Sequence, residues 1–329
     1  MMRENENQLL APAMIIDWQL GDPALTSGPM VAAIGNFDGV HIGHQQLIAK
    51  AKEIADADGL PLAIITFTPH PRAFFRPNDP AFLLQDPFLK NHMLAGLGVS
   101  SIIQVQFDEA LQHLSAEAFV SDVLGKMQIT HICAGADFAF GKGRAGTMES
   151  LSVLGAQMGM QVTPVHLLSD EHASVVSSSR IRAALQAGQV DLAAEMLGRP
   201  MLISGQVIEG DRRGRTLGFP TANIMLDNLL VPALGVYAVD AWLGQPVGAP
   251  VASGVCNIGR RPTINDRGIL AETHLFDFDQ DIYGQRLTIA LKGYIRAEVK
   301  FSSLDALQRQ IAEDVEAARS YAPSEILTA

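Results

Sequence analysis

Residues 29–59 read PMVAAIGNFDGVHIGHQQLIAKAKEIADADG, and this stretch decides the fold of the first half of the chain. Its apolar start, residues 29–37, predicts a short buried strand that ends in a glycine turn. The next residues predict a helix over 41–59, with Gly59 as its stop. The free N–H groups and the dipole of such a helix start favour anion binding, and glycines let the backbone approach a phosphate closely.

Two histidines, His41 and His44, flank the predicted helix start. Their three-residue spacing lets both side chains face one ligand. Imidazoles placed there could donate hydrogen bonds to phosphate oxygens and stabilise the charge that develops in a transition state. The stretch supplies no nucleophile, which fits direct nucleotidyl transfer by positioning and electrostatics. Ordinary structural or surface histidines are the alternative; metal ligation is another, although no third ligand with suitable spacing is evident.

The rest of the first half alternates strands and helices without a hairpin signal. Further strands are predicted over 60–67, 100–107, 129–138 and 160–168, and helices over 115–127 and 147–159. This alternation predicts an α/β domain with a parallel, doubly wound sheet. Ligands of such sheets bind at the carboxyl ends of the strands.

The pattern changes after a helical connector, residues 179–200. From Ile203 onward the strands alternate apolar and polar residues, and the turns are rich in Gly, Pro, Asp and Asn. Strands are predicted over 203–210, 235–243, 252–259, 270–278 and 286–295, followed by an amphipathic helix over 302–321. This half is predicted to be an antiparallel β-barrel with a C-terminal helix. We place the domain boundary in the connector, which gives domains 1–186 and 187–329.

The bulk composition limits the class of protein. A length of 329 residues suits two domains, and a net charge of −11 at pH 7 argues against nucleic-acid binding. We find no signal-peptide core and no apolar run near the roughly 20 residues of a membrane span, so we expect a cytoplasmic protein without a membrane partner. Cys133 and Cys256 lie in apolar runs and are expected to be buried reduced thiols, with a catalytic cysteine or a disulfide as alternatives.

The second half has a glycine-rich stretch of its own, GDRRGRTLGFPTANI at 210–224. Its glycines leave room for a phosphate chain, and three arginines add positive charge. Thr221 and Asn223 alternate, so both can point to one side of an extended segment. A hydroxyl and an amide oxygen suit Mg²⁺, which prefers oxygen ligands. An ordinary glycine-rich turn is the alternative.

One carboxylate of the second half, Glu272, lies inside an apolar predicted strand. Desolvation there would raise the pKa of its side chain towards that of a useful general base. A strand carboxylate that faces solvent is the alternative.

Four segments of the first half, in order, resemble the FMN adenylyltransferase module of the bacterial bifunctional riboflavin kinase/FAD synthetase family. They are GNFDGVHIGHQ from Gly35, TFTPHPR at 66–72, GADFAFGKGRAG at 135–146 and SSSRIR at 177–182. The resemblance implies a Rossmann-like nucleotidyltransferase domain of the HxGH type. The residues that it implies for ATP binding are Gly35, Asn36, Phe37, Asp38, Gly39, His41, His44, Asp137, Ser177, Ser178, Ser179 and Arg182.

This chain departs from the adenylyltransferase pattern at three positions. Ser179 stands where the family usually has threonine and keeps the hydroxyl. Val175 and Ala139 stand where relatives often carry a basic residue. These two positions motivate one rival hypothesis, a kinase whose adenylyltransferase half is impaired.

The second half resembles the riboflavin kinase of the same family. Matching segments are 210–224, GVYAV at 235–239, CNIGRRPTI at 256–264 and Glu272-Thr273-His274-Leu275. The resemblance implies that Glu272 is the catalytic base and that Thr221 and Asn223 hold the metal. The residues that it implies for ATP and flavin binding are Gly210, Arg215, Gly218, Pro220, Thr221 and Asn223.

The resemblance covers roughly residues 14–320 and implies two successive reactions. Riboflavin would be phosphorylated by ATP to FMN, and FMN would then be adenylylated by ATP to FAD and pyrophosphate. Mg²⁺ is the implied cofactor; riboflavin, FMN, FAD and ATP are the implied partners. A flavin carrier that has lost its chemistry is a rival from another class. Incubation with riboflavin, ATP and Mg²⁺ separates the hypotheses by whether FAD, FMN or unchanged riboflavin results.

Overall fold

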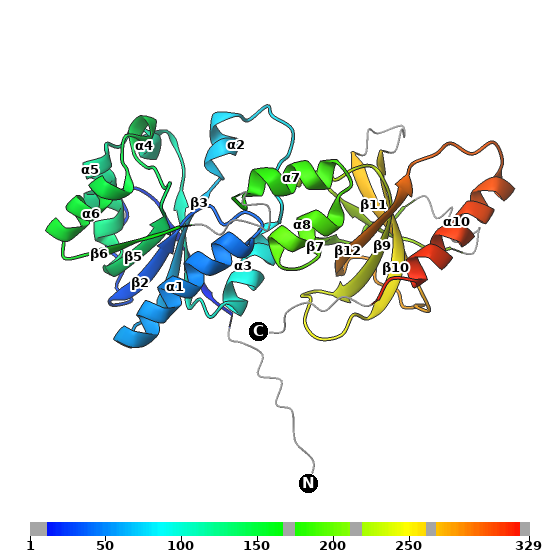
Figure 1. Ribbon diagram of the computed structural model, residues 1–329, viewed down its shortest axis with the longest axis horizontal. Helices are drawn as coiled ribbons and strands as arrows, with labels where there is room; N and C mark the ends of the chain where they lie inside the picture. The colour runs from blue at the N-terminus through cyan, green and yellow to red at the C-terminus, as the bar shows by residue number, and fades with distance from the viewer. Residues whose placement is uncertain (1–11, 167–174, 211–218, 261–267, 323–329) are drawn as a thin grey trace, which may run out of the picture. The chain divides into compact units, whose positions relative to one another are not determined.

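The computed structural model describes residues 12–166, 175–210, 219–260 and 268–322, which fall into two compact units (Figure 1). The first unit consists of Met1–Asp79 and Asn91–Ser169, and the second of Pro80–Lys90 and Asp170–Ala329. Among the described residues, none of the helices is long and apolar enough to cross a bilayer.

The first unit is built on a parallel sheet, as predicted, and its strand order is β1-β4-β3-β2-β5-β6. Its strands are β1 (Met14–Trp18), β2 (Met30–Ile34), β3 (Leu62–Thr68), β4 (Ser101–Gln106), β5 (Ile129–Gly135) and β6 (Gln161–Val165). Every residue of β2 is buried, because apolar clusters cover both faces of the sheet. The edge strand β1 was not predicted; Met14 and Ile15 are exposed there, so no buried run marks it.

Helices connect these strands. They are α1 (Ile42–Asp58), α2 (Pro71–Phe75), α3 (Pro87–Gly96), α4 (Glu109–Gln112), α5 (Ala116–Ala118) and α6 (Met148–Gln157), together with a 3₁₀ turn at Lys142–Arg144. Helices α1 and α6 confirm two predicted helices. The third, predicted over 115–127, is not one α-helix: α5 continues into a π-helical segment, Phe119–Val123, and a 3₁₀ turn, Leu124–Lys126. Phe119 and Val123 are buried, so the apolar side was predicted correctly although the helix type was not.

The second unit contains an antiparallel sheet with the order β7-β12-β9-β10-β11-β8. Its strands are β7 (Met201–Gln206), β8 (Ala222–Met225), β9 (Gly235–Leu243), β10 (Ala252–Arg260), β11 (Ile269–Leu275) and β12 (Arg286–Ala297). An antiparallel bridge between Ile208, just after β7, and Asn223 of β8 brings the two edges together, so the sheet curls into the predicted barrel. The short strand β8 was predicted only as an extended segment.

Helices α7 (Ser178–Gln186), α8 (Val190–Leu197) and α10 (Leu304–Arg319) complete the second unit. Helix α10 matches the predicted C-terminal helix. It packs on an apolar cluster that includes Val236 and Ala238, and Asp314 of α10 accepts two hydrogen bonds from Arg296 of β12, at 2.7 and 2.6 Å.

Two segments that precede residue 187 lie in the second unit. The N–H of Ala233 donates to the carbonyl of Leu185 in α7, at 2.9 Å. In Pro80–Lys90, Leu83 forms a bridge with Leu229, and the Asp86 carboxylate accepts from Arg286 at 2.8 Å. The boundary between residues 186 and 187 was inferred from sequence patterns, and it stays a prediction.

Candidate active sites

The turn between β2 and α1 has an unusual backbone. Phe37, Gly39 and Val40 have positive φ angles of 52°, 85° and 42°. For Phe37 and Val40 this is a strained conformation, and the burial of both side chains helps to hold it. The Thr66 hydroxyl donates to the Asn36 carbonyl at 3.2 Å, which ties the turn to β3. The structure therefore keeps the predicted anion-binding turn in one defined shape.

The two histidines lie at the start of α1, as predicted, and their side chains contact each other. Their rings stack with centroids 3.6 Å apart and planes 17° apart. His41 is the N-cap of α1, and its Nδ1 accepts from the backbone N–H of His44 at 3.3 Å. Because Nδ1 is the acceptor, a neutral His41 carries its proton on Nε2 and can donate it to a ligand. Phe37 packs against His44, with centroids 5.2 Å apart.

Asp137 lies in the turn that follows β5, the strand next to β2. Because Ile34 pairs with Ala134, the Asp137 turn and the histidine turn leave the same edge of the sheet. The Asp137 side chain is exposed, and its Oδ1 lies 2.9 Å from the point where a Cβ on Gly135 would sit. A carboxylate and two imidazoles thus follow neighbouring strand ends, where ligands of doubly wound sheets bind.

Sequence reasoning missed an aromatic group beyond the carboxyl ends of β3 and β4. Phe74 and Phe75 of α2 both lie against Phe107, with ring centroids 5.4 and 5.6 Å away. Phe75 is 59% exposed, which is unusual for so large an apolar side chain. The adjacent phenylalanines of the sequence were a possible signal, but only the sheet order places them beside Phe107.

The serines of the SSSRIR motif lie in the second unit, at the start of α7. Ser177 is the N-cap, and its side chain accepts from the N–H of Arg180 at 3.4 Å. The predicted phosphate ligand Arg182 donates from Nε to the carbonyl of Phe82 at 2.8 Å, and its guanidinium lies 5.2 Å from the Phe82 ring centroid. Arg182 therefore also anchors the Pro80–Lys90 segment. Ser178 and Ser179 are helical, and their phosphate contacts stay a prediction.

The predicted kinase residues Asn223 and Glu272 are brought together by the barrel. They pair directly across β8 and β11, so their side chains share one face of the sheet. Asn223 is 3% exposed, and its Oδ1 has no hydrogen-bond partner among the described residues. Gly210 packs against this amide, because a Cβ on Gly210 would overlap the Asn223 nitrogen. Arg215 and Gly218, also predicted for this site, lie outside the described residues.

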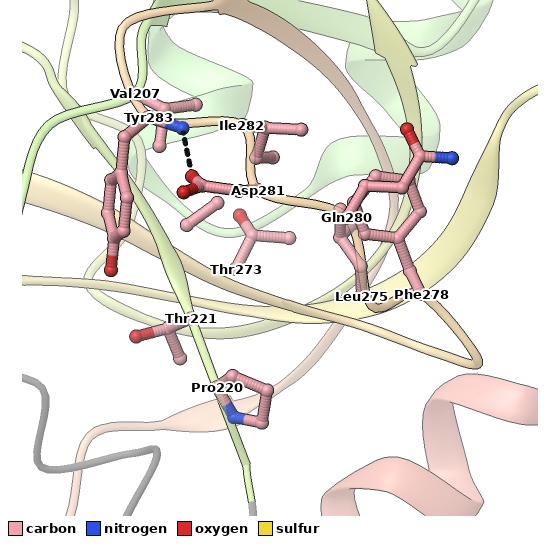
Figure 2. Close-up of a pocket in the computed structure, with 11 residues that line it drawn as sticks. Val207, Pro220, Thr221, Thr273, Leu275, Phe278, Gln280, Asp281, Ile282 and Tyr283 are labelled. Atoms are coloured by element: carbon pink, nitrogen blue, oxygen red, sulfur yellow. Dashed lines mark hydrogen bonds between the residues drawn. The ribbon is translucent and has the colours of Figure 1, made fainter.

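A pocket opens on the face of β8 and β11 that carries Ala222 and Thr273, and Pro220 and Thr221 also line it (Figure 2). The carbonyl of Pro220 lies 2.9 Å from Nδ1 of His274, which fixes the start of β8 against β11. On the far wall the Asp281 carboxylate accepts from the N–H of Tyr283 at 3.1 Å. The pocket is lined by Val207, Pro220, Thr221, Ala222, Thr273, Leu275, Phe278, Gln280, Asp281, Ile282 and Tyr283.

Glu272 itself does not line this pocket, because it lies on the face of β11 opposite to Thr273. The loop residues from Phe278 to Tyr283 were not predicted as part of the site. Their proximity to Thr221 depends on the pairing of β8 with β11, which the sequence pattern does not reveal.

The two cysteines are free and buried, as expected. Burial raises the pKa of the Cys133 thiol to about 11 and that of the Cys256 thiol to about 12. Both thiols are therefore protonated at neutral pH, which argues against a catalytic thiolate. Within the described ranges, no group of three or more His, Cys, Asp and Glu side chains is arranged to hold a metal.

Comparisons with known proteins match two family models to successive parts of the chain. The sequence model of the FAD synthetase family matches residues 25–180, and that of the riboflavin kinase family matches residues 197–322. Similar curated proteins include the "Bifunctional riboflavin kinase/FMN adenylyltransferase" of Bacillus subtilis strain 168, which is 41% identical over 297 residues, covering 88% of this chain and 92% of the relative. The protein of that name from Escherichia coli K12 is 39% identical over 292 residues, with the same two coverages of 88% and 92%.

A solved structure also resembles the whole chain. It is named "Crystal Structure of Macrolide-efflux Protein from Streptococcus pneumoniae". It is 32% identical, has a TM-score of 0.83, and covers 94% of this chain and 100% of its own.

Proposed function

The chain belongs to the bifunctional riboflavin kinase/FMN adenylyltransferase family, and from this premise we propose which of its residues carry each reaction. It phosphorylates riboflavin to FMN with ATP and adenylylates FMN to FAD. The observation that carries the assignment is the match of one family model to each half of a chain that is about 40% identical to the named relatives.

The adenylyltransferase reaction is assigned to the histidine turn. The FMN phosphate attacks the α-phosphorus of ATP, the bond to the bridging oxygen breaks, and pyrophosphate leaves. Negative charge grows on the phosphate oxygens in the transition state, where donors stabilise it most. His41, His44 and the first N–H groups of α1 supply such donors. Ser177, Arg182 and the intervening residues remain the proposed ligands of the ATP phosphates.

The flavin ring of FMN is assigned to the aromatic group of Phe74, Phe75 and Phe107. Flat conjugated rings stack favourably on aromatic side chains, and Phe75 exposes more than half of its surface. The group follows β3 and β4, at the edge of the sheet from which the histidine turn also emerges.

The kinase reaction is assigned to Glu272. The ribityl primary hydroxyl forms a bond to the γ-phosphorus of ATP, and its proton passes to the Glu272 carboxylate. ADP leaves as the bond between the γ-phosphorus and the bridging oxygen breaks. Asn223 pairs with Glu272 across the two strands, so its amide lies next to the Glu272 carboxylate on the same face of the sheet. The pocket around Thr221 and Tyr283, which opens on the other face of β11, is proposed to hold a part of ATP that does not react.

Asn223 and Thr221 fit the expected Mg²⁺. The buried Oδ1 of Asn223, unpartnered within the described part of the chain, is costly unless a donor or a cation satisfies it, and Mg²⁺ accepts amide and hydroxyl oxygens. Thr221 precedes Asn223 by two residues in the extended segment, so it can present its hydroxyl on the same side. When bound, the ion would neutralise charge on the ATP phosphates.

The free thiols Cys133 and Cys256 support a reducing setting, and we place the protein in the cytoplasm on that ground.

The direct test of function is incubation of the purified chain with riboflavin, ATP and Mg²⁺, followed by chromatography. We expect riboflavin to be converted to FMN and then FAD. Accumulation of FMN alone would mean an inactive adenylyltransferase half, for which Val175 and Ala139 are the first suspects. Unchanged riboflavin would refute both assignments.

We also propose that the two activities reside on separate domains, 1–186 and 187–329. All strands of the barrel follow residue 200, and both kinase residues lie on them. A fragment that starts at 187 loses α7, which packs within the second unit. Fragments 175–329 and 187–329 should therefore both form FMN, and the shorter one should melt at a lower temperature. A fragment that is folded by circular dichroism yet inert with ATP and Mg²⁺ would refute the assignment.

A further inference from the structure

A second polar pair lies beside Glu272 and has no part in the proposed mechanism. Asn257 of β10 is the direct cross-strand partner of Glu272, on the side opposite to Asn223. The Asn257 amide nitrogen donates to Oε1 of Glu298 at 3.4 Å. Glu298 is the first residue after β12, so this small group draws on β10, β11 and the segment that follows β12.

The backbone leaves room for this pair at one glycine. A methyl group on Gly259 would overlap the Glu298 carboxylate and would lie 3.0 Å from the Asn257 amide nitrogen. The φ angle of Gly259 is not in the positive region, so its conformation does not require glycine. The missing side chain is instead what lets Glu298 reach over the strand to Asn257.

The chemistry of the three side chains suits a bridge. Ionised Glu272 and Glu298 can only accept hydrogen bonds, and they flank an amide whose nitrogen carries two hydrogens. Because Glu298 accepts one of these hydrogens, the amide nitrogen of Asn257 points towards Glu298 and the orientation of the amide is fixed. Cross-strand partners lie close enough to restrict each other's rotamers. The orientation of Asn257 therefore limits the positions that the Glu272 carboxylate can take.

We propose that Asn257 is a positioning residue for Glu272 in the riboflavin kinase reaction, and that Glu298 orients the Asn257 amide. This inference rests on the proposed role of Glu272 as the base. A base must lie within hydrogen-bond reach of the hydroxyl whose proton it takes. A displacement of about 1 Å can cost on the order of 100-fold in rate. Loss of the amide should therefore lower turnover without removing a contact to riboflavin.

The test uses the full chain and measures riboflavin kinase kcat and KM. Asn257→Ser should lower kcat by about 10- to 100-fold and leave KM for riboflavin within about threefold. Glu298→Ala should lower kcat less, by about 3- to 10-fold, since it acts through Asn257. Glu298→Gln keeps an acceptor oxygen at the same place and should retain most of the activity. Glu313→Ala, which removes an exposed carboxylate of α10, is the matched control and should change nothing.

Double variants separate positioning from a general structural effect. If Glu298 acts only through Asn257, Glu298→Ala should have no further effect in the Asn257→Ser background. Similarly, Asn257→Ser should have no further effect in the Glu272→Gln background. Multiplicative losses in either pair would overturn the inference. FMN adenylylation by each variant reports whether the chain is folded.

Two further results keep the inference separate from the proposed function. If Glu272→Gln lowers kcat while Asn257→Ser leaves it within threefold, the positioning role is wrong and the role of Glu272 stands. If Glu272→Gln itself has no effect, the proposed base is wrong. Should Asn257→Ser fail to fold, Gly259→Ala replaces it. This variant changes no polar side chain, and by displacing Glu298 it should lower kcat as much as Glu298→Ala does.

Discussion

Replacing His44 with alanine should separate the two activities of the chain. The His44 ring stacks on His41 at 3.6 Å and packs against Phe37 at 5.2 Å. Its backbone N–H, which bonds to Nδ1 of His41, is kept in the variant. The start of α1 should therefore survive, while the proposed donor to the ATP phosphates is lost.

The expected magnitudes for stability and for rate differ. Loss of the two ring contacts of His44, to His41 and Phe37, should cost roughly 1–3 kcal/mol of folding free energy. Loss of a transition-state donor should lower FAD formation from FMN by about 10²–10³, or about 2.7–4 kcal/mol. His41→Ala should lose one ring contact, to His44, and the helix cap, which typically costs about 1 kcal/mol.

The assay is the initial rate of FAD formation from FMN and ATP, with riboflavin phosphorylation measured on the same preparation. Kinase turnover should stay within about twofold of the wild type, since Glu272 and Asn223 lie in the other unit. His113→Ala, which removes an exposed imidazole from the first unit, is the matched control. A His44→Ala protein that forms FAD within threefold of the wild-type rate would refute the role of His44.

Three further predictions concern the barrel and the thiols. Glu272→Gln should lower kinase turnover by about 10²–10⁴ with little change in KM for riboflavin, and turnover within a few-fold of wild type over roughly pH 6–9 would exclude it as the base. Gly210→Ala should displace the Asn223 amide and raise the Mg²⁺ concentration for half-maximal kinase activity at least about tenfold. An unchanged Mg²⁺ titration would show that Asn223 does not hold the metal. Because the pKa values of Cys133 and Cys256 are raised from 9 to about 11 and about 12, the native state retains protons that the unfolded chain releases. The contribution of the two thiols to the free energy of unfolding should therefore be complete below about pH 9 and be lost between pH 9 and 12. Urea titrations should show a shallower fall of this free energy in a double Cys→Ala variant than in the wild type.

Elements with a strong local signal were predictable from the sequence. Strand β2 is a short apolar run, and the structure buries every residue of it. Helix α1 begins and ends within one residue of its predicted limits, because His41 caps its start and Gly59 takes the left-handed conformation at its end. The two histidines could be placed together because a helix start fixes residues three apart on one side.

Features that depend on distant pairing were not predictable. Arg182 has the residue type of a phosphate ligand, yet its Nε is bonded to the carbonyl of Phe82, 100 residues earlier. Nothing in the local sequence of either residue signals this contact. Asn257 and Glu298 likewise became candidates only when the register of β10 with β11 was known.

The kinase residues differ from the adenylyltransferase residues in how they are held. His41 and His44 depend on a strained turn, so changes near Phe37 or Val40 should affect both stability and FAD formation. Asn223, Glu272 and Asn257 form a row across β8, β11 and β10, and the register of three paired strands fixes their spacing. Main-chain hydrogen bonds set that register, so single side-chain changes in the row leave it intact. Substitutions in this row should therefore lower kinase turnover strongly and stability only slightly. Substitutions in the histidine turn should instead lower FAD formation and stability together.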